Sequence, residues 1–486
     1  MDRRTFIHLS AATLATLHLP KASADERPAS LRVTLRPDRL GNRIENDFTG
    51  LSYESAQLGN PNFFSGDNAG LIGFVRRLGD SGVLRIGGNT SEYCYWAPNP
   101  GKETWVASDR VVPPDTGRTV PPSVNITPQA IRNLRDFIDA TGWKLIYGLN
   151  MGTGSVEDAA AEAAYVMDVT GPKLLALQLC NEPDLFYRNA IRKSDYDFAQ
   201  FAEEWQRYYG AIRARVPNAP FAGPDTVFNN SWLAPFAQKF KNEVRFITQH
   251  YYAEGPPTDP SMTLERLLRP DPKLQEQFDG MKKTVQETGL PFRLAETNSC
   301  YSAGKLGVSD TFASALWGTG LMYQLASEGG AGINFHGGGY GWYTPIAGTK
   351  ENGFTARPLY YGMLLFAEAG AGQLTESRIE GLELAPLLNA YGLRSSGGSV
   401  KAVILNKNLD CKVQLKIDSG TAARSARVLR LHAPRADDTT DVTFGGASVG
   451  GSGNWSTMRE EKLPAQDGIV TLEMPAATAA LVTFSD

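Results

Sequence analysis

The sequence predicts an α/β chain in which a (β/α)8 TIM barrel carries a second β-sandwich domain. The chain has 486 residues, more than one ordinary single-core domain holds. From about residue 48 to about 367, short apolar runs alternate with amphipathic helical stretches, which indicates repeated βα units. After about residue 370, apolar and polar residues alternate with a period of two between Gly, Ser and Asp turns, as in β-sandwich strands.

Eight short apolar runs are the expected barrel strands. They span residues 48–53, 83–87, 144–149, 174–179, 221–223, 245–250, 292–295 and 332–336. Between them, helices are expected over stretches such as 194–216 and 309–325, and Thr127-Pro128 is a typical start for another. Eight βα units in about 320 residues suit a (β/α)8 barrel with insertions.

The expected sandwich strands span residues 382–388, 399–406, 412–417, 426–432 and 468–474. A lone strand at 31–35 has no partner in the barrel, so we expect it to join the sandwich. The expected organisation is therefore an export signal at 1–24, an N-terminal sandwich strand within 25–47, the catalytic barrel at 48–367 and the sandwich at 368–486.

The N-terminus has the pattern of a twin-arginine export signal. Asp2-Arg3-Arg4-Thr5-Phe6-Ile7 precedes a weakly apolar stretch, and Ala22-Ser23-Ala24 resembles a cleavage site. The apolar stretch is too short to span a membrane, and a frayed helix is the alternative. We expect a bacterial protein that is exported to the periplasm or secreted.

Composition excludes several classes of partner and site. The net charge of -4 makes nucleic acid and anionic membranes poor partners. Cys94, Cys180, Cys300 and Cys411 form no CxxC pair, so buried packing is the expected role of those beside the strand ends. The chain has no HExxH motif or histidine cluster, and we expect neither a metal centre nor another cofactor.

Two glutamates follow buried strands in matching settings. Glu182 ends the fourth expected strand and Glu296 ends the seventh. In a closed parallel barrel the carboxyl ends of the strands meet at one face, where active sites are built. Two such carboxyl groups are what hydrolysis of a glycosidic bond requires. Either glutamate alone could instead cap a helix or pair with an arginine.

Other strand ends add polar groups to the same face. Glu54 ends the first strand, and Arg85, Gly88 and Asn89 end the second. Arg85 could pair with Glu296 and lower its pKa, or form a structural ion pair inside the barrel.

The fourth and sixth strand ends add further candidates. Asn181 precedes Glu182 and could hydrogen-bond a sugar 2-hydroxyl. At the sixth strand end, Tyr251 or Tyr252 could donate to the nucleophilic carboxylate, whereas His250 could be a core histidine.

The longest insertion, residues 89–125, follows the second strand and holds Tyr93, Tyr95, Trp96 and Trp105. Aromatic side chains on this face of a barrel could stack on sugar rings. The alternative is that the loop folds on its own aromatic residues.

Four segments together give a specific resemblance. Asn181-Glu182-Pro183, Glu296, Arg85-Ile86-Gly87-Gly88-Asn89 and Gln249-His250-Tyr251-Tyr252 resemble clan A glycoside hydrolases, and within them family 79. That family contains heparanase and microbial β-glucuronidases. The resemblance implies Glu182 as acid/base, Glu296 as nucleophile, retention of configuration and a substrate that carries glucuronic acid.

The resemblance also implies a site for the uronate carboxylate. Tyr301 and Tyr343 match the tyrosines that hold it, and Ala303 or Gly304 matches the backbone N–H donor. Lys305 and Arg357 are alternatives supported by position alone. The residues expected to bind substrate are Glu54, Gly88, Asn89, Asn181, Tyr251, Tyr301, Ala303, Gly304 and Tyr343, with Arg85 and His250 in support.

The expected function is that of a retaining exo-β-glucuronidase acting on glycans or glycosides that contain glucuronic acid. An endo-acting, heparanase-like enzyme is an alternative, but the strand-end loops lack the dense Lys/Arg cluster that a sulfated chain would need. A neutral-sugar hydrolase of the same clan is another. A carbohydrate-binding protein without catalysis is the fourth, and the presence of both glutamates and Asn181 counts against it.

Overall fold

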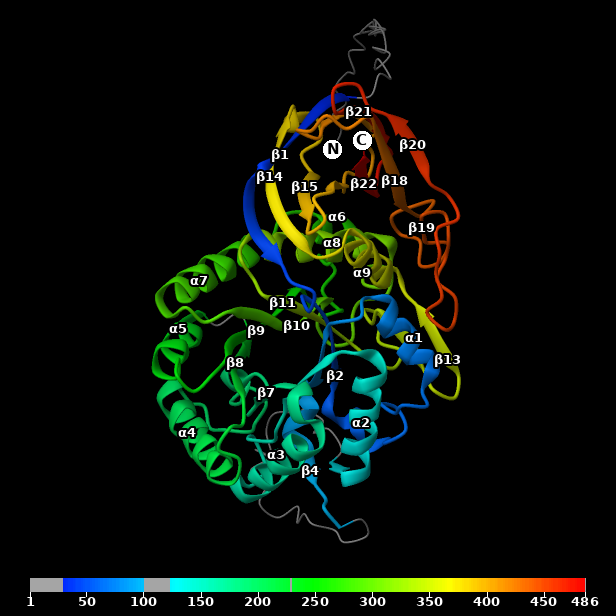
Figure 1. The fold of residues 1–486 in the computed structure, drawn as a ribbon. Helices are drawn as coiled ribbons and strands as arrows, with labels where there is room; N and C mark the ends of the chain where they lie inside the picture. Colours follow the sequence, from blue (N-terminus) through cyan, green and yellow to red (C-terminus); the bar gives the residue numbers. More distant parts are fainter. Residues whose placement is uncertain (1–28, 100–122, 228–229, 486) are drawn as a thin grey trace, which may run out of the picture.

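The computed structural model describes residues 29–99, 123–227 and 230–485. Its centre is a closed barrel of eight parallel strands (Figure 1). In barrel order from β2 these are β2 (Thr49–Glu54), β3 (Val83–Gly87), β6 (Lys144–Gly148), β7 (Leu174–Gln178), β8 (Phe221–Val227), β9 (Phe246–Glu254), β10 (Phe292–Cys300) and β11 (Gly332–Gly337). The predicted TIM barrel is thus confirmed, with each of its eight strands at the expected place in the sequence.

Three barrel strands extend further than the sequence predicts. β8, β9 and β10 continue beyond residues 223, 250 and 295, and β10 is buried along its whole length. Register irregularities interrupt the pairing between Pro224 and Thr226 and between Leu294 and Glu296. Such an irregularity re-aims side chains, and here it occurs where the polar residues of the barrel mouth begin.

Helices surround the barrel. They are α1 (Ala69–Arg77), α2 (Pro128–Thr141), α3 (Val156–Thr170), α4 (Phe198–Arg215), α5 (Asn230–Lys239), α6 (Leu264–Leu268), α7 (Pro272–Thr288), α8 (Phe312–Ser327) and α9 (Pro358–Ala369). The α2 helix begins as predicted: the Thr127 hydroxyl accepts from the Ala130 N–H, and Pro128 opens the helix.

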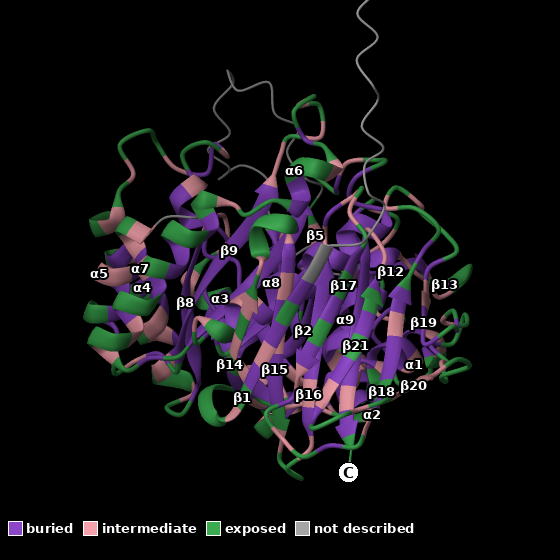
Figure 2. Ribbon diagram, turned by 90° about the horizontal axis from the view of Figure 1, so that it is seen from above, coloured by how far each residue is buried: buried purple, intermediate pink, exposed green. Residues whose placement is uncertain are grey.

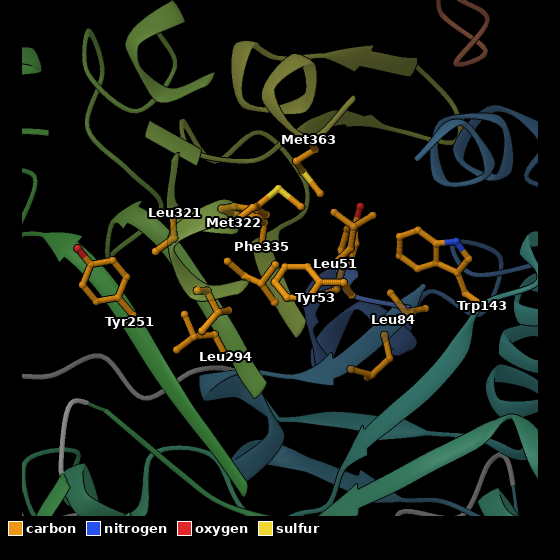
Figure 3. Packing of buried hydrophobic residues seen from close by; sticks show 14 of the residues in the cluster. Leu51, Tyr53, Leu84, Trp143, Tyr251, Leu294, Leu321, Met322, Phe335 and Met363 are labelled. Atoms are coloured by element: carbon orange, nitrogen blue, oxygen red, sulfur yellow. The ribbon is translucent and has the colours of Figure 1, made fainter. Parts of the chain in front are cut away.

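Apolar side chains that leave the barrel strands outward pack beneath these helices. Figure 3 shows Leu51, Leu84, Leu294 and Phe335 of the strands gathered with Met322 of α8. The α8 helix is buried on nearly every side, because it lies between the barrel and the second domain (Figure 1).

The second domain is a ten-stranded sheet that folds as the predicted β-sandwich. Its strands are β1 (Ala29–Ile44), β14 (Gly372–Glu380), β15 (Leu388–Ser395), β16 (Val400–Asn406), β17 (Val413–Asp418), β18 (Ser425–His432), β19 (Thr443–Phe444), β20 (Glu461–Pro464), β21 (Ile469–Met474) and β22 (Thr478–Ser485). β1 lies between β14 and β17, so a segment from before the barrel completes the sheet. Figure 2 shows alternating burial along β21, as expected for strands with one face in a core.

The strand expected at residues 382–388 is wrong. Leu382–Leu384 form the short 3-10 helix η6, and β15 begins only at Leu388. Gly381 adopts φ 80°, which turns the chain out of the sheet, and both Leu382 and Leu384 are exposed. Leu382 and Leu384 therefore belong to a turn at the surface and not to a strand.

Smaller elements lie at the ends of the barrel strands. They are η1 (Ser55–Gly59), η2 (Asn89–Tyr93), β4 (Cys94–Trp96), β5 (Val124–Ile126), η4 (Gly171–Lys173), η5 (Pro183–Leu185), β12 (Ile346–Thr349) and β13 (Gly353–Ala356). The expected export signal and Trp105 fall outside the described residues. Within residues 29–99, 123–227 and 230–485, no helix has the length and apolar character needed to span a membrane. Cys180 and Cys300 are buried free thiols, in line with a packing role.

Candidate active site

Glu182 and Glu296 face each other inside the mouth of the barrel. Glu182 follows β7 and adopts φ 51°, with its N–H donating to the Asp225 carbonyl at 3.0 Å. Glu296 lies within β10. One side-chain atom each from Glu182, His250 and Glu296 lie within 4.8 Å of one another, and all three side chains are buried. The strands thus bring the two predicted carboxyl groups together.

Cationic and hydrogen-bonding groups surround Glu296. Arg85 Nη1 lies 2.6 Å from Oε2, and the Tyr252 hydroxyl donates to Oε1 at 2.6 Å. His336 Nδ1 lies 3.6 Å from Oε2. Burial by itself would raise the pKa of Glu296, but His336, His250, Arg85 and the bond from Tyr252 together hold it well below its usual range. These neighbours therefore favour the ionised form of the Glu296 carboxyl.

Arg85 is the centre of this network. Besides Glu296, its Nη2 donates to Asp225 Oδ2 at 2.6 Å and to Asn181 Oδ1 at 2.8 Å. Its Nε donates to Gln178 Oε1 at 2.9 Å, and the side chain is fully buried. The Arg85–Glu296 pair that the sequence suggested is present, and Arg85 also orients the Asn181 amide.

His250 connects the acid/base candidate to a third carboxylate. Its Nδ1 lies 2.9 Å from Glu182 Oε1, and its Nε2 lies 3.1 Å from Asp225 Oδ1. Burial would lower the pKa of His250, but Asp225 and Glu296 raise it to about 10, so the imidazole is charged.

The Glu182 carboxyl has the opposite tendency to Glu296. Burial raises its pKa, the bond with His250 opposes that shift, and the negative charges on Glu296 and Asp225 raise it further. Two carboxyl groups whose surroundings push their pKa values apart are suited to the roles of proton donor and ionised nucleophile.

Sequence reasoning missed Asp225 and Glu92. Asp225 lies just beyond residue 223, where the sequence analysis ended the fifth strand, whereas β8 continues to Val227. Glu92 accepts from the Asn181 N–H at 2.7 Å and from the Gly152 N–H at 2.5 Å. The signal for Asp225 was an acidic residue directly after a buried strand, as at Glu182.

The residues expected at the first two strand ends lie together. The Glu54 carboxylate accepts from the Thr90 N–H at 2.8 Å and lies 3.3 Å from His336 Nε2. Asn89 Oδ1 accepts from Asn181 Nδ2 at 3.3 Å. Gly88 adopts φ 74°, and a Cβ there would lie 2.5 Å from Glu54 Oε2, so only glycine fits.

Tyr251 is a correction to the expected binding set. Its hydroxyl donates to Asp271 Oδ2 at 2.9 Å, outside the barrel wall, and its ring packs in the hydrophobic cluster shown in Figure 3. Side chains on a strand alternate between faces, so His250 and Tyr252 point into the mouth and Tyr251 points away. Tyr252 is the tyrosine that reaches Glu296.

The residues expected to hold a uronate line the mouth beside Tyr252. The Tyr343 and Tyr301 ring centroids lie 6.3 Å and 6.4 Å from that of Tyr252. Tyr343 is nearly buried, whereas Tyr301 is 42% exposed. Ala303 and Gly304 both adopt positive φ, and the Ala303 carbonyl accepts from the Trp342 N–H. This left-handed turn joins the loop after β10 to the loop that carries Tyr343.

The alternative cations are engaged elsewhere. Lys305 Nζ donates to the Asp259 carbonyl at 2.6 Å. Arg357 donates to the Gly341 carbonyl at 2.8 Å and stacks over Trp342. Neither makes a contact with Glu182 or Glu296.

The aromatic residues of the 89–125 insertion are packed where the structure describes them. Tyr93, Tyr95 and Trp96 are buried, and Trp96 lies against Tyr165 at a centroid distance of 5.1 Å. They are not exposed platforms. Tyr340 and Trp342, on the loop after β11, are the exposed aromatic side chains near Tyr343.

Glu182, His250 and Glu296 have the spacing of a possible cation site, which no sequence motif showed. The two histidine nitrogens are already engaged by Glu182 and Asp225, and Arg85 supplies a positive charge at Glu296. A further cation between them would be repelled by these groups. The expectation of no metal centre remains a prediction.

Comparison with known proteins identifies two family models. The glycosyl hydrolase family 79 N-terminal domain matches residues 191–322, and the family 79 C-terminal β domain matches residues 390–481. A β-glucuronidase of Aspergillus niger is 23% identical over 99% of both chains. A β-glucuronidase of Neurospora crassa is 26% identical over 71% of this chain and 68% of its own.

Solved structures share the fold. A 4-O-α-L-rhamnosyl-β-D-glucuronidase from Fusarium oxysporum superposes with a TM-score of 0.73 at 17% identity, covering 93% of this chain and all of that one. An α-L-arabinofuranosidase from Thermotoga maritima superposes with a TM-score of 0.67 at 15% identity, over 93% of this chain and 99% of that one. The two family models match in chain order on a barrel that carries a sandwich, so both domains of the chain are similar to glycoside hydrolase family 79.

Proposed function

We propose that this chain is a retaining exo-β-glucuronidase that removes terminal β-linked glucuronic acid by double displacement. The observation that carries the proposal is the contrast between two facing carboxyl groups. Glu296 is held ionised by Arg85, Tyr252 and the histidines, whereas the pKa of Glu182 is raised by burial and by neighbouring negative charge.

In the first step Glu296 attacks the anomeric carbon, and Glu182 donates its proton to the leaving oxygen. In the second step Glu182 takes a proton from water, which attacks the same carbon and releases Glu296. Atoms of the two carboxyl groups lie within 4.8 Å. This supports retention, because retaining enzymes have carboxyl groups about 5 Å apart and inverting enzymes about 6.5–9.5 Å apart.

Arg85 supports both steps through its partners. It donates a hydrogen bond to the Glu296 carboxylate. It also donates to Asn181 Oδ1, so Nδ2 is the atom of that amide that can donate at the mouth. A hydrogen bond from that donor to the sugar 2-hydroxyl would strengthen as positive charge develops at the anomeric carbon.

The uronate assignment is supported by the names of the two fungal relatives and by the groups at the mouth. Tyr301, Tyr343 and the backbone N–H of Ala303 or Gly304 are the proposed donors to the substrate carboxylate. Glu54, Gly88 and Asn89 are further proposed contacts of the sugar, since Glu54 lies beside His336 and Gly88, and Asn89 contacts Asn181.

The organisation of the chain around this activity is also a proposal. The barrel is assigned to residues 48–367, and the sandwich to 368–486 with a strand from 25–47. Residues 1–24 are proposed as a twin-arginine signal for export, on the sequence pattern described above.

Rates on nitrophenyl β-glucuronide and nitrophenyl β-glucoside test the proposal directly. A site built to hydrogen-bond a group rejects analogues that lack it by large factors, so the glucuronide should be strongly preferred. NMR of the first-formed product should show the β-anomer. Equal rates on both substrates would overturn the uronate assignment, and an initial α-anomer would overturn retention.

A further inference from the structure

A cavity of about 250 Å³ lies between the barrel and the sandwich. The barrel contributes the end of β9, α6, the start of α7, and α8, and the sandwich contributes β15 and the residue after β16. In Figure 1 α6 and α8 lie next to the sandwich. Tyr251 lines this cavity, whereas its neighbour Tyr252 reaches Glu296, so strand β9 separates the cavity from the catalytic pair.

Lys407 brings an uncompensated charge to the cavity. The side chain is half-buried, its Nζ approaches Gly320 of α8, and no charged group among the described residues shifts its pKa. Burial lowers the pKa of Lys407 to about 8. An ammonium group removed from water without a partner is costly, and an anion beside it would offset that cost.

Asn389 offers an unused acceptor on the same wall. Its Oδ1 is buried without a hydrogen-bond partner among the described residues. Asn389 pairs with Leu405 in the β15–β16 ladder, two residues before Lys407, so both side chains leave the same face of the sheet. A ligand that satisfies both groups needs an anionic group for Lys407 and a hydroxyl donor for Asn389.

Two carboxylates and two arginines also line the cavity. Arg266 pairs with Glu254 at 2.5 Å, and the Asp271 carboxylate accepts from the Tyr251 hydroxyl at 2.9 Å. Arg269 lies at the exposed rim. Neither carboxylate shifts the pKa of Lys407, so its ammonium group is a positive charge without a partner among the cavity residues that the structure describes.

We propose that this cavity is a second binding site, for a hydroxylated carboxylate of one ring, such as a hexuronate. The carboxylate would lie on Lys407 and a hydroxyl on Asn389, with the ring beside Trp317 and Tyr391, which also line the cavity. The volume is below the roughly 300–1,000 Å³ of sites for drug-sized ligands, which restricts the occupant to about one sugar ring. The inference does not rest on the proposed function, because no catalytic residue lines the cavity.

Calorimetric titration of the full chain with D-glucuronate, with D-glucose as the uncharged comparison, tests this site. Lys407→Met removes the ammonium group and keeps the length of the side chain. Lys416→Met removes an exposed charge on β17 as the matched control, and Tyr343→Phe perturbs the proposed active site instead. We expect Lys407→Met to weaken one glucuronate site by at least about tenfold, the low end for a hydrogen bond to a charged group.

That site should be unchanged in Lys416→Met and in Tyr343→Phe, and glucose should bind it far more weakly. Hydrolysis of glucuronides should be unchanged in Lys407→Met. Glucuronate binding that is identical in wild type and Lys407→Met would overturn the inference. A Lys407-dependent site in a protein that cleaves no glucuronide would leave the inference intact while removing the proposed function.

A second measurement needs no substitution. Reductive methylation of the native protein, followed by mass spectrometry, reports how accessible each lysine amine is. Glucuronate at saturating concentration should slow methylation of Lys407 and leave Lys416 unaffected. Equal methylation of Lys407 with and without glucuronate would also overturn the proposal, even if Lys407→Met does not fold.

Discussion

The roles proposed for Glu182 and Glu296 differ because the two side chains have different neighbours. Glu296 has Arg85 and the Tyr252 hydroxyl at 2.6 Å each. Glu182 has His250 at 2.9 Å and no arginine contact among the described residues. The pKa of the carboxyl group is therefore raised at Glu182 and lowered at Glu296.

Replacement of Glu182 by Ala tests the role of proton donor. A nitrophenolate can leave without being protonated, whereas an alkyl alcohol leaves only when its oxygen receives a proton. The activity should therefore fall about 10²–10⁴-fold on alkyl glucuronides and much less on nitrophenyl glucuronide. The measurement is kcat/KM for a series of leaving groups. Added azide should restore turnover and yield the β-azide. A uniform loss across the series would contradict the assignment.

Replacement of Tyr343 by Phe tests the carboxylate site. The lost hydroxyl would donate to a charged oxygen, a contact worth about 1.5–3 kcal/mol, so kcat/KM on nitrophenyl β-glucuronide should fall about 10- to 150-fold. Residual activity on the β-glucoside should be nearly unchanged, because the ring still packs beside Tyr252.

Tyr340→Phe is the matched control for that experiment. Tyr340 is exposed on the same loop, and its hydroxyl makes only a long contact of 3.4 Å with Asn352. It should therefore leave both activities unchanged. Equal losses on glucuronide and glucoside in Tyr343→Phe would show that the tyrosine is structural.

At the scale of elements, the buried acid Glu92 connects two loops at the mouth of the barrel through hydrogen bonds. Glu92 lies in η2, after β3, and accepts from backbone N–H groups in the loops after β6 and β7. One of these belongs to Asn181, next to Glu182. The position of the proposed acid/base residue thus depends on a side chain two strands away in the barrel.

Glu92→Gln should therefore destabilise the fold. An amide has a single acceptor oxygen, so one of the two N–H groups loses its partner, at a cost of about 1–3 kcal/mol in the free energy of unfolding. Urea denaturation measures this.

Glu162→Gln is the control for Glu92, because Glu162 is also a buried acid whose pKa is raised to about 7. It accepts the Tyr147 hydroxyl through one oxygen, which Gln can replace. Equal stability of the two variants would contradict the positioning role of Glu92.

At the scale of the whole molecule, buried titratable groups make the stability of the fold depend on pH. Burial raises the pKa of Glu92, Glu162 and Asp184 to about 7 each, above the roughly 4 of the unfolded chain. Their contribution is complete below about pH 4 and is lost as the pH rises through 7. Asp225 and Glu296 have lowered pKa values, so their contribution is lost only as the pH falls below about 4.

His250 acts in the same direction as the raised acids. Its pKa of about 10 exceeds the unfolded value of about 6.5, so its contribution is lost between those values as the pH rises. The melting temperature should therefore be highest near pH 4–5 and fall steadily toward pH 9. Scanning calorimetry in buffers of equal ionic strength measures it. A melting temperature that rises between pH 5 and pH 8 would contradict these charge states.

The order of buried runs along the chain predicted the barrel, because eight apolar segments with helical stretches between them have few other ways to bury their surface. The position of Glu182 and Glu296 at strand ends predicted a shared site for the same reason: parallel strands in a closed barrel place all their carboxyl ends at one face. These features depend on local pattern and on strand direction, which one sequence contains.

The choice between Tyr251 and Tyr252 depended on which face of β9 turns inward, and the sequence Gln249-His250-Tyr251-Tyr252, with a polar group on every side chain, does not say which. The contribution of Asp225 depended on how far β8 continues past Pro224. The charge states depended on the distances from Arg85 and His250, which lie far from Glu296 in the chain and meet it only when the barrel closes. Electrostatic interaction falls with distance and grows with burial, so the tertiary structure determines why the pKa of Glu182 is raised and that of Glu296 is lowered.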